Sequence, residues 1–229
     1  MFVSRDSREG VLVMNREDAI QAQAAAQVYR VLARVFAAKP TEQACEELVQ
    51  TAHLLGCDEF TVPWPSAAEA EAAFCERFII PDGRKYVPLS ENCITAAYKD
   101  NSADQGDAFR WGACSGPCTI HVAECYRAAG FNPGQVREIA PSAAALRDDS
   151  LAMELFFMAF LATCYERAFE QEHAVEGIRV WQEHFLSDHL LNWVGKAADI
   201  LARTDNDVYA RAAQLVEAWC KLDLERVRG

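Results

Sequence analysis

The stretch DDSLAMELFFMAFL, residues 148–161, decides the fold. From Leu151 to Leu161 every residue except Glu154 is apolar. A helix that is apolar all round lies inside a protein, surrounded by other helices. The triplet Asp-Asp-Ser in front of the run is typical of an N-terminal cap, because its side-chain oxygens accept from the first free N–H groups of a helix. The stretch therefore predicts the central helix of an all-α protein.

Composition limits the classes of partner. The chain has 229 residues, 51% of them apolar, with a formal net charge of −12. A surface that binds nucleic acid is basic, so we expect no nucleic-acid partner. The first residues lack the unbroken apolar run of a secretory signal, and the longest run, Leu155 to Cys164, is too short to span a membrane. We therefore expect a cytoplasmic protein with no stable membrane insertion. Its nine cysteines, an odd number, favour free thiols.

Helix signals recur along the rest of the chain. Helix starts are expected at Thr41, at Ser66 with Glu69 as a capping box, and at Pro117, and stops at Gly56 and Gly130. The expected helices are 16–39, 42–55, 66–80, 118–129, 150–172, 174–185, 189–203 and 207–224. Between them we expect an extended surface loop at 84–91, a mobile loop at 100–112 and a connection at 131–147. The prediction is a flexible N-terminal arm over 1–14 and a single all-helical domain over 15–229.

Three patches carry a resemblance to a known family. They are DSLAMELFFMAFL at 149–161, FLSDHLLNW at 185–193, and FCERFIIP at 74–81 with VPLSE at 87–91. A helix end, YRAAGF, follows the same family pattern at 126–131. In their order and spacing these patches resemble the TorD/DmsD/NarJ family of cytoplasmic chaperones for molybdenum enzymes. The similarity covers roughly residues 27–224. It departs from the family at Ser150, where the family pattern has a histidine.

The resemblance implies both a fold and a function. The implied fold is a single-domain helical bundle of the TorD-like type. The implied function is that of a system-specific chaperone, with no catalysis and no cofactor of its own. Such a chaperone binds the twin-arginine signal peptide of a molybdopterin-dependent oxidoreductase precursor and assists cofactor insertion before Tat export. Its partners are the leader and the body of the catalytic subunit, and the family's exchange of helices between subunits makes a homodimer an expectation as well.

The expected binding groove follows from the chemistry of such a leader. A peptide with two arginines and an apolar stretch needs carboxylates at one end of its groove and aromatic side chains along it. Asp148, Asp149 and Glu91 are the candidate carboxylates. Phe74, Phe78, Trp111 and Phe157 are the candidate aromatic residues. The full set of expected peptide-binding residues is Asp148, Asp149, Ser150, Glu154, Phe74, Arg77, Phe78, Glu91, Trp111 and His189.

Some of these residues also have structural interpretations. A histidine at a helix junction often bonds a nearby carbonyl or carboxylate, so we favour a structural role for His189 over that of a ligand or base. A carboxylate inside an apolar run must be paired if it is buried. For Glu154 we favour an internal pair with Arg77 over a partner's arginine. For the Asp148 and Asp149 pair we favour helix capping over a general-acid dyad.

A cysteine and histidine cluster supports an alternative function. Cys118, His121 and Cys125 share one face of the expected helix, and Cys114 precedes it. Such a set is able to hold zinc or an iron–sulfur cluster, or to form a reversible Cys114–Cys118 disulfide. The alternative is therefore a metal- or redox-active helical protein. Because the spacing matches no standard zinc motif, we favour core cysteines and no metal.

Overall fold

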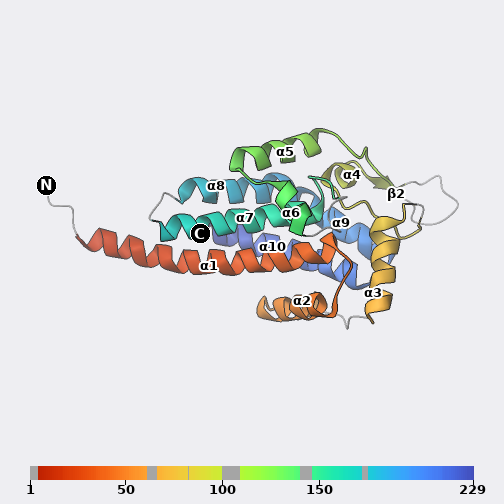
Figure 1. The fold of residues 1–229 in the computed structure, drawn as a ribbon, viewed down its shortest axis with the longest axis horizontal. Helices are drawn as coiled ribbons and strands as arrows, with labels where there is room; N and C mark the ends of the chain where they lie inside the picture. The colour runs from red at the N-terminus through yellow and green to blue at the C-terminus, as the bar shows by residue number, and fades with distance from the viewer. Residues whose placement is uncertain (1–4, 61–65, 82, 100–108, 140–145, 172–174) are drawn as a thin grey trace.

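The computed structural model describes residues 5–60, 66–81, 83–99, 109–139, 146–171 and 175–229. Within this part of the chain the protein is almost entirely helical, as the sequence predicted (Figure 1). The helices are α1 Arg5–Ala37, α2 Glu42–Leu54, α3 Ala67–Phe74, α4 Glu91–Thr95, α5 Pro117–Ala129, α6 Pro133–Ile139, α7 Leu151–Glu170, α8 Glu176–Phe185, α9 Leu191–Thr204 and α10 Val208–Arg228. The shorter elements are the 3₁₀ turn η1 Asp58–Phe60, the π turns η2 Cys75–Ile79 and η4 Leu186–Leu190, and the strands β1 Tyr98–Lys99 and β2 Phe109–Arg110.

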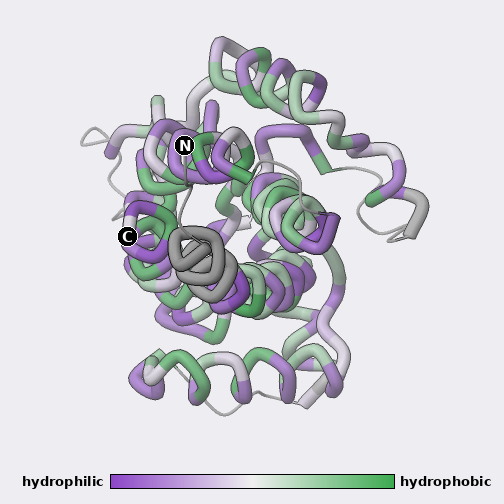
Figure 2. The backbone as a smooth tube through the Cα atoms, turned by 90° about the vertical axis from the view of Figure 1, so that its left-hand side faces the viewer, coloured by the Kyte–Doolittle hydropathy of each residue, from purple (hydrophilic) through white to green (hydrophobic). Residues whose placement is uncertain are grey.

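The long helices α1, α7, α8, α9 and α10 form the body of the bundle. Helix α1 packs most extensively on α7, and α9 packs on α10. Helices α2 and α3 lie on one side of this body and α5 lies on the opposite side (Figure 1). Seen along the bundle, apolar and polar residues alternate around most helices, the pattern of helices with one buried face (Figure 2).

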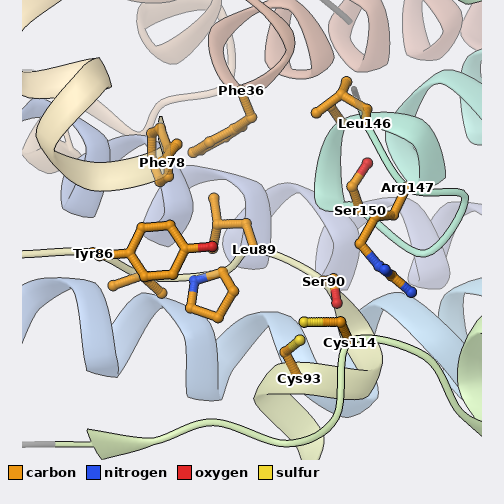
Figure 3. Close-up of a pocket in the computed structure, with 13 residues that line it drawn as sticks. Phe36, Phe78, Tyr86, Leu89, Ser90, Cys93, Cys114, Leu146, Arg147 and Ser150 are labelled. Carbon is orange, nitrogen blue, oxygen red and sulfur yellow. The ribbon is translucent and has the colours of Figure 1, made fainter. Parts of the chain in front are cut away.

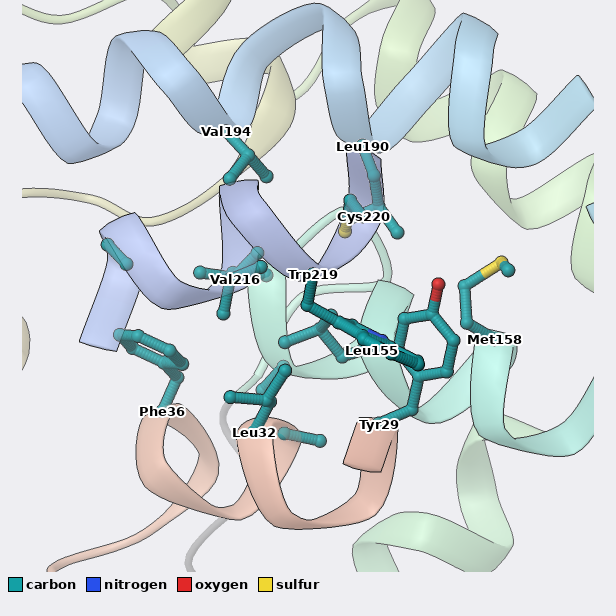
Figure 4. Close-up of a cluster of buried hydrophobic side chains, with 14 of the residues drawn as sticks. Tyr29, Leu32, Phe36, Leu155, Met158, Leu190, Val194, Val216, Trp219 and Cys220 are labelled. Atoms are coloured by element: carbon teal, nitrogen blue, oxygen red, sulfur yellow. The ribbon is translucent and has the colours of Figure 1, made fainter. Parts of the chain in front are cut away.

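Helix α7 is the centre of the hydrophobic core. Every residue from Leu151 to Leu155 is buried, which confirms the predicted central helix. Side chains of α1, α7 and α10 meet in the cluster of Figure 4, where Tyr29 lies edge-on to Trp219 with ring centres 5.6 Å apart. The hydroxyl of Tyr29 also donates to the buried Asp223 carboxylate of α10 at 2.7 Å, a contact between residues 194 positions apart.

Local capping signals are confirmed. The Thr41 hydroxyl accepts from the backbone N–H of Ala44 at 3.2 Å, and Ser66 and Glu69 form the reciprocal capping box. Gly56 and Gly130 stop their helices with left-handed φ angles of 67° and 77°. That region is open to glycine at little cost, so both stops depend on the absence of a side chain.

Three expectations about connecting segments are corrected. Helix α1 begins at Arg5, inside the segment expected to be an arm. The extended segment 84–91 does not cross the surface at its end, because Val87, Ser90 and Glu91 are buried. Helix α6 lies within the expected connection 131–147.

Two further segments differ in detail. Helices α8 and α9 are joined by η4 without a break at residue 189. Of the expected loop 100–112, residues 100–108 lie outside the described part, and Phe109 pairs antiparallel with Lys99. In the described residues no helix is long and apolar enough to cross a membrane.

A buried arginine in η2, the π turn that follows α3, binds the turn between α9 and α10. Arg77 in η2 has no exposed side-chain surface. Its Nε donates to Asp207 Oδ2 at 2.9 Å, and its remaining nitrogens donate to the carbonyls of Leu201 and Asp205. The other oxygen of Asp207 caps α10 by accepting from the N–H groups of Tyr209 and Ala210. One carboxylate therefore serves both a buried charge and a helix start.

We predict that Asp207→Asn lowers the free energy of unfolding by about 3 kcal/mol, because it leaves the Arg77 guanidinium buried without its counter-ion. Urea denaturation followed by circular dichroism measures the change. The control is Glu71→Gln, which removes an exposed pair with Lys39 and is expected to cost less than about 1 kcal/mol. Equal effects of the two variants would contradict a special role for the buried pair.

Candidate functional site

The N-terminus of α7 is joined to the segment 89–92 by backbone hydrogen bonds. Ser90 and Ser150 form an isolated antiparallel bridge, in which the N–H of Leu151 donates to the carbonyl of Leu89 at 3.1 Å. The Ser150 hydroxyl accepts from the N–H of Met153, so the residue that replaces the family histidine caps the helix. The central helix is thereby positioned against the Val-Pro segment.

Asp149 is fully buried at this junction. Its Oδ2 accepts from the N–H of Asn92 at 3.2 Å and from the Thr119 hydroxyl at 2.9 Å. Its Oδ1 accepts from Arg147 Nε at 3.2 Å, and its carbonyl accepts from the N–H of Glu91 at 2.8 Å. Asp149 thus connects three segments of the chain, and it is not available to a peptide in this conformation.

A second buried polar pair, formed by His189 and Glu91, lies next to this junction. His189 Nδ1 and Glu91 Oε2 are 2.8 Å apart, and both side chains are almost fully buried. Burial lowers the pKa of His189, but its hydrogen bonds with Cys125 and Glu91 outweigh this effect and raise the pKa to about 10. The pair is therefore an ion pair at neutral pH. This agrees with the structural role that we favoured for His189.

The predicted pair between Glu154 and Arg77 is not present. Arg77 binds Asp207, and Glu154 Oε2 instead accepts from the indole N–H of Trp193 at 3.0 Å. Burial and the neighbouring Glu91 raise the pKa of Glu154 well above its ordinary value. The physical reason for the error is that a buried carboxyl also avoids an unpaired charge by keeping its proton, without a cationic partner.

An apolar pocket opens beside the junction (Figure 3). It encloses about 170 Å³. Its lining residues are Phe36, Phe78, Tyr86, Val87, Pro88, Leu89, Ser90, Cys93, Cys114, Leu146, Arg147, Ser150 and Ala152. Aromatic and aliphatic side chains from four separate segments dominate this wall, and the polar groups lie toward the N-terminus of α7. Such a surface suits a chain segment with apolar side chains followed by polar ones.

Asp148 is the accessible carboxylate of the expected set. It lies in the turn that contributes Leu146 and Arg147 to the pocket, and about a third of its side chain is exposed. Its Oδ1 accepts from Arg137 Nη2 at 2.7 Å, and Arg137 is exposed to a similar extent. An ion pair with this exposure is weak, because solvent screens both charges.

The structure separates the expected peptide-binding residues into two groups. Ser150 and Phe78 line the pocket, and Asp148 lies beside it. Trp111 is half-buried and stacks on Phe109 at 5.9 Å, outside the pocket wall. The buried members make internal contacts instead; they are Phe74, Arg77, Glu91, Asp149, Glu154 and His189. Phe157 is likewise buried in an aromatic cluster.

Several pocket residues were missed by sequence reasoning. Tyr86, Pro88 and Leu89 belong to the segment expected to be a surface loop, and Leu146 and Arg147 belong to the expected connection. The available signal was the Val-Pro patch of the family resemblance, which lies at this wall. An extended, proline-containing segment shows no helical or strand periodicity, so the sequence pattern does not indicate which of its side chains are buried.

The predicted Cys114, Cys118, His121 and Cys125 cluster is divided. Cys114 lies in the pocket wall beside Cys93, with which its thiol interacts. Burial, together with Cys114, raises the pKa of Cys93. Among the described residues, the set whose possible ligand atoms lie within 4.8 Å of one another is His121, Cys125 and His189. Neither Cys114 nor Cys118 belongs to it.

Comparison with known families places the chain. The model of the family described as nitrate reductase delta subunit matches residues 37–199. The chain belongs to this family, whose members are maturation chaperones of molybdoenzymes. The protein therefore has a general chaperone role, with a molybdoenzyme as its partner. No curated protein and no solved structure matches the chain.

The protonated state of Glu154 leads to a prediction about pH. An acid with a raised pKa keeps its proton in the folded state at pH values where the unfolded chain has released it. The free energy of unfolding therefore falls as pH rises above about 4.3. Glu154→Gln removes this term, so the variant gains stability relative to the wild type between pH 5 and pH 8. Urea denaturation at both pH values checks this, and a difference that does not change with pH would contradict a protonated Glu154.

Proposed function

We propose that the protein is a system-specific chaperone that binds the twin-arginine signal peptide of a molybdopterin-dependent oxidoreductase precursor. It acts in the cytoplasm before export and assists insertion of the cofactor. The observation that carries the proposal is the apolar pocket of Figure 3 beside the Asp148–Arg137 ion pair, in a chain of the nitrate reductase delta subunit family.

The pocket supports the proposal through its shape and lining. A signal peptide has an apolar stretch next to its arginines, and the pocket has an apolar wall next to a carboxylate. Phe78, Tyr86 and Leu89 supply contact area for the apolar stretch. The net charge of −12 further attracts a basic leader over longer distances.

The arginine of the leader is recognised by exchange in this proposal. A leader guanidinium displaces Arg137 from Asp148 and takes over its charge-assisted hydrogen bond. Arg137 is held in addition by the carbonyl of Leu146 at 2.9 Å, so it competes with the leader without leaving the site. Replacing the two partners of the pair then has opposite effects on affinity.

We predict that Asp148→Asn weakens leader binding by about tenfold, or about 1.4 kcal/mol, whereas Arg137→Gln strengthens it. Calorimetric titration with a synthetic twin-arginine leader of a molybdoenzyme from the same organism measures both. The matched control is Asp18→Asn on α1, an exposed residue that interacts with Tyr165 toward the other end of α7. Asp149→Ala is unsuitable, since it removes a buried structural carboxylate.

Weaker binding in both Asp148→Asn and Arg137→Gln would contradict the exchange and indicate a need for the intact ion pair. Unchanged leader affinity in both variants would be compatible with the chaperone function but would show that the leader binds elsewhere on the protein. If the wild type binds no twin-arginine leader of any molybdoenzyme from its own organism, the proposed function is wrong.

The apolar wall is tested separately. Leu146 is half-buried in the pocket, and Leu146→Ala removes apolar contact area there. We expect leader affinity to fall by about 1 kcal/mol, the order of magnitude for the apolar surface that is lost. If Leu146 contacts the apolar stretch, a leader in which that stretch is replaced by serines binds the wild type and Leu146→Ala with equal affinity. Loss of affinity for that leader as well would show that the variant disturbs more than the pocket.

A further inference from the structure

Three metal-binding side chains converge on the face of the bundle that carries α5. His121 and Cys125 lie one helical turn apart on α5, and His189 comes from η4. Cys125 Sγ and His189 Nε2 are 4.0 Å apart, and the ring centres of His121 and His189 are 4.9 Å apart. The possible ligand atoms of all three lie within 4.8 Å of one another.

These distances are close to those of a zinc site. With Zn–S bonds of about 2.3 Å and Zn–N bonds of about 2.0 Å, tetrahedral geometry places sulfur and nitrogen roughly 3.5 Å apart. It also places the centres of two bound imidazole rings about 5 Å apart. The Cys125–His189 separation therefore needs a contraction of about half an ångström, and the widest pair of ligand atoms, within 4.8 Å, needs one of roughly an ångström or more. The His121 side chain is exposed, so a change of its rotamer is able to supply this movement.

His189 is already oriented for a metal. Its Nδ1 is bonded to the Glu91 carboxylate at 2.8 Å, and its ring stacks on Phe185 at 4.7 Å. The carboxylate fixes the ring so that Nε2 points toward Cys125. A carboxylate behind a histidine is the usual outer support of a zinc-bound imidazole, which it orients and makes more basic.

The local charges also match a divalent cation. Cys125 binds metal as a thiolate and His189 binds it through a deprotonated Nε2, so each releases one proton to solvent when the ion binds. The thiolate and the Glu91 carboxylate together offset the two positive charges of the cation. One thiolate and two imidazoles are ligands that zinc prefers and that magnesium or calcium do not.

We propose that His121, Cys125 and His189 bind a zinc ion, while the Glu91 carboxylate orients His189 through its bond to Nδ1. A cavity of about 200 Å³ adjoins the three side chains and leaves room for a fourth ligand. Asp188 and His184 line the same cavity. Cys125 and His189 alone would be sufficient for a nucleophile and its general base. The presence of His121 beside them therefore favours a metal site over such a pair.

Cobalt titration of the full-length, untagged protein tests the site. Co²⁺ replaces zinc in tetrahedral sites, and a thiolate ligand gives it a charge-transfer band in the near ultraviolet. We expect one Co²⁺ per chain, displaced by one equivalent of Zn²⁺. In Cys125→Ser the charge-transfer band is lost. His121→Ala changes an exposed residue, so it weakens binding without unfolding the protein, as circular dichroism will verify.

Further variants separate the proposed ligands from the neighbouring cysteines. Glu91→Gln is expected to weaken Co²⁺ affinity by about 10–100-fold, because an amide makes the bound His189 imidazole less basic than a carboxylate does. The matched controls Cys114→Ser and Cys118→Ser leave the spectrum and the affinity unchanged. A charge-transfer band that survives in Cys125→Ser, or that disappears in Cys118→Ser, overturns the assignment. Absence of Co²⁺ binding, combined with rapid alkylation of Cys125, overturns it in favour of a reactive thiol.

Discussion

The buried carboxylate of Asp149 is the interaction on which the rest of the structure depends. A carboxylate without exposed surface is costly unless it is paired and hydrogen-bonded. Here the groups that satisfy it come from α4, from the start of α5 and from the turn before α7. These elements are therefore fixed relative to one another by a single residue. The pocket wall formed by 86–90, the accessible Asp148 and the Glu91 side chain that supports His189 all take their positions from this junction.

Two of the other buried ionic groups lie in π-helical turns. Arg77 lies in η2 and His189 in η4, and each is buried with a carboxylate partner. A π turn inserts one extra residue and so rotates the following side chains relative to a regular helix. In η4 this coincides with a histidine that contacts Glu91, Cys125 and His121 at once. The irregular backbone thus lies where the chain brings polar chemistry into an apolar bundle, which is where such turns are common.

The sequence was sufficient for features that depend on neighbours a few residues apart. The caps at Thr41 and Ser66, the stop at Gly130 and the apolar α7 all follow from short-range patterns. The candidate site depends on pairs that lie far apart, such as Cys125 with His189 and Arg77 with Asp207. Such pairs leave no periodic signal in one sequence, so the alternative metal-binding set of the sequence analysis contained Cys114 and Cys118 and lacked His189. For Glu154 the expected ion pair is absent. Its Oε2 accepts from the Trp193 indole, its Oε1 has no hydrogen-bond partner, and burial raises its pKa, which are consequences of burial that the sequence does not display.

The contact between Tyr29 and Asp223 has a consequence for biosynthesis. The first long helix and the last one share the core, so the part of the α1 face around Tyr29 that contacts α10 is not covered until α10 has been synthesised, although α7 covers most of the face earlier. Closing such a distant contact is entropically costly and slow compared with the local formation of each helix. During translation α1 therefore exposes a surface on which general folding factors are able to act. A protein that guards the maturation of another enzyme thus completes its own core only after α10 has been made.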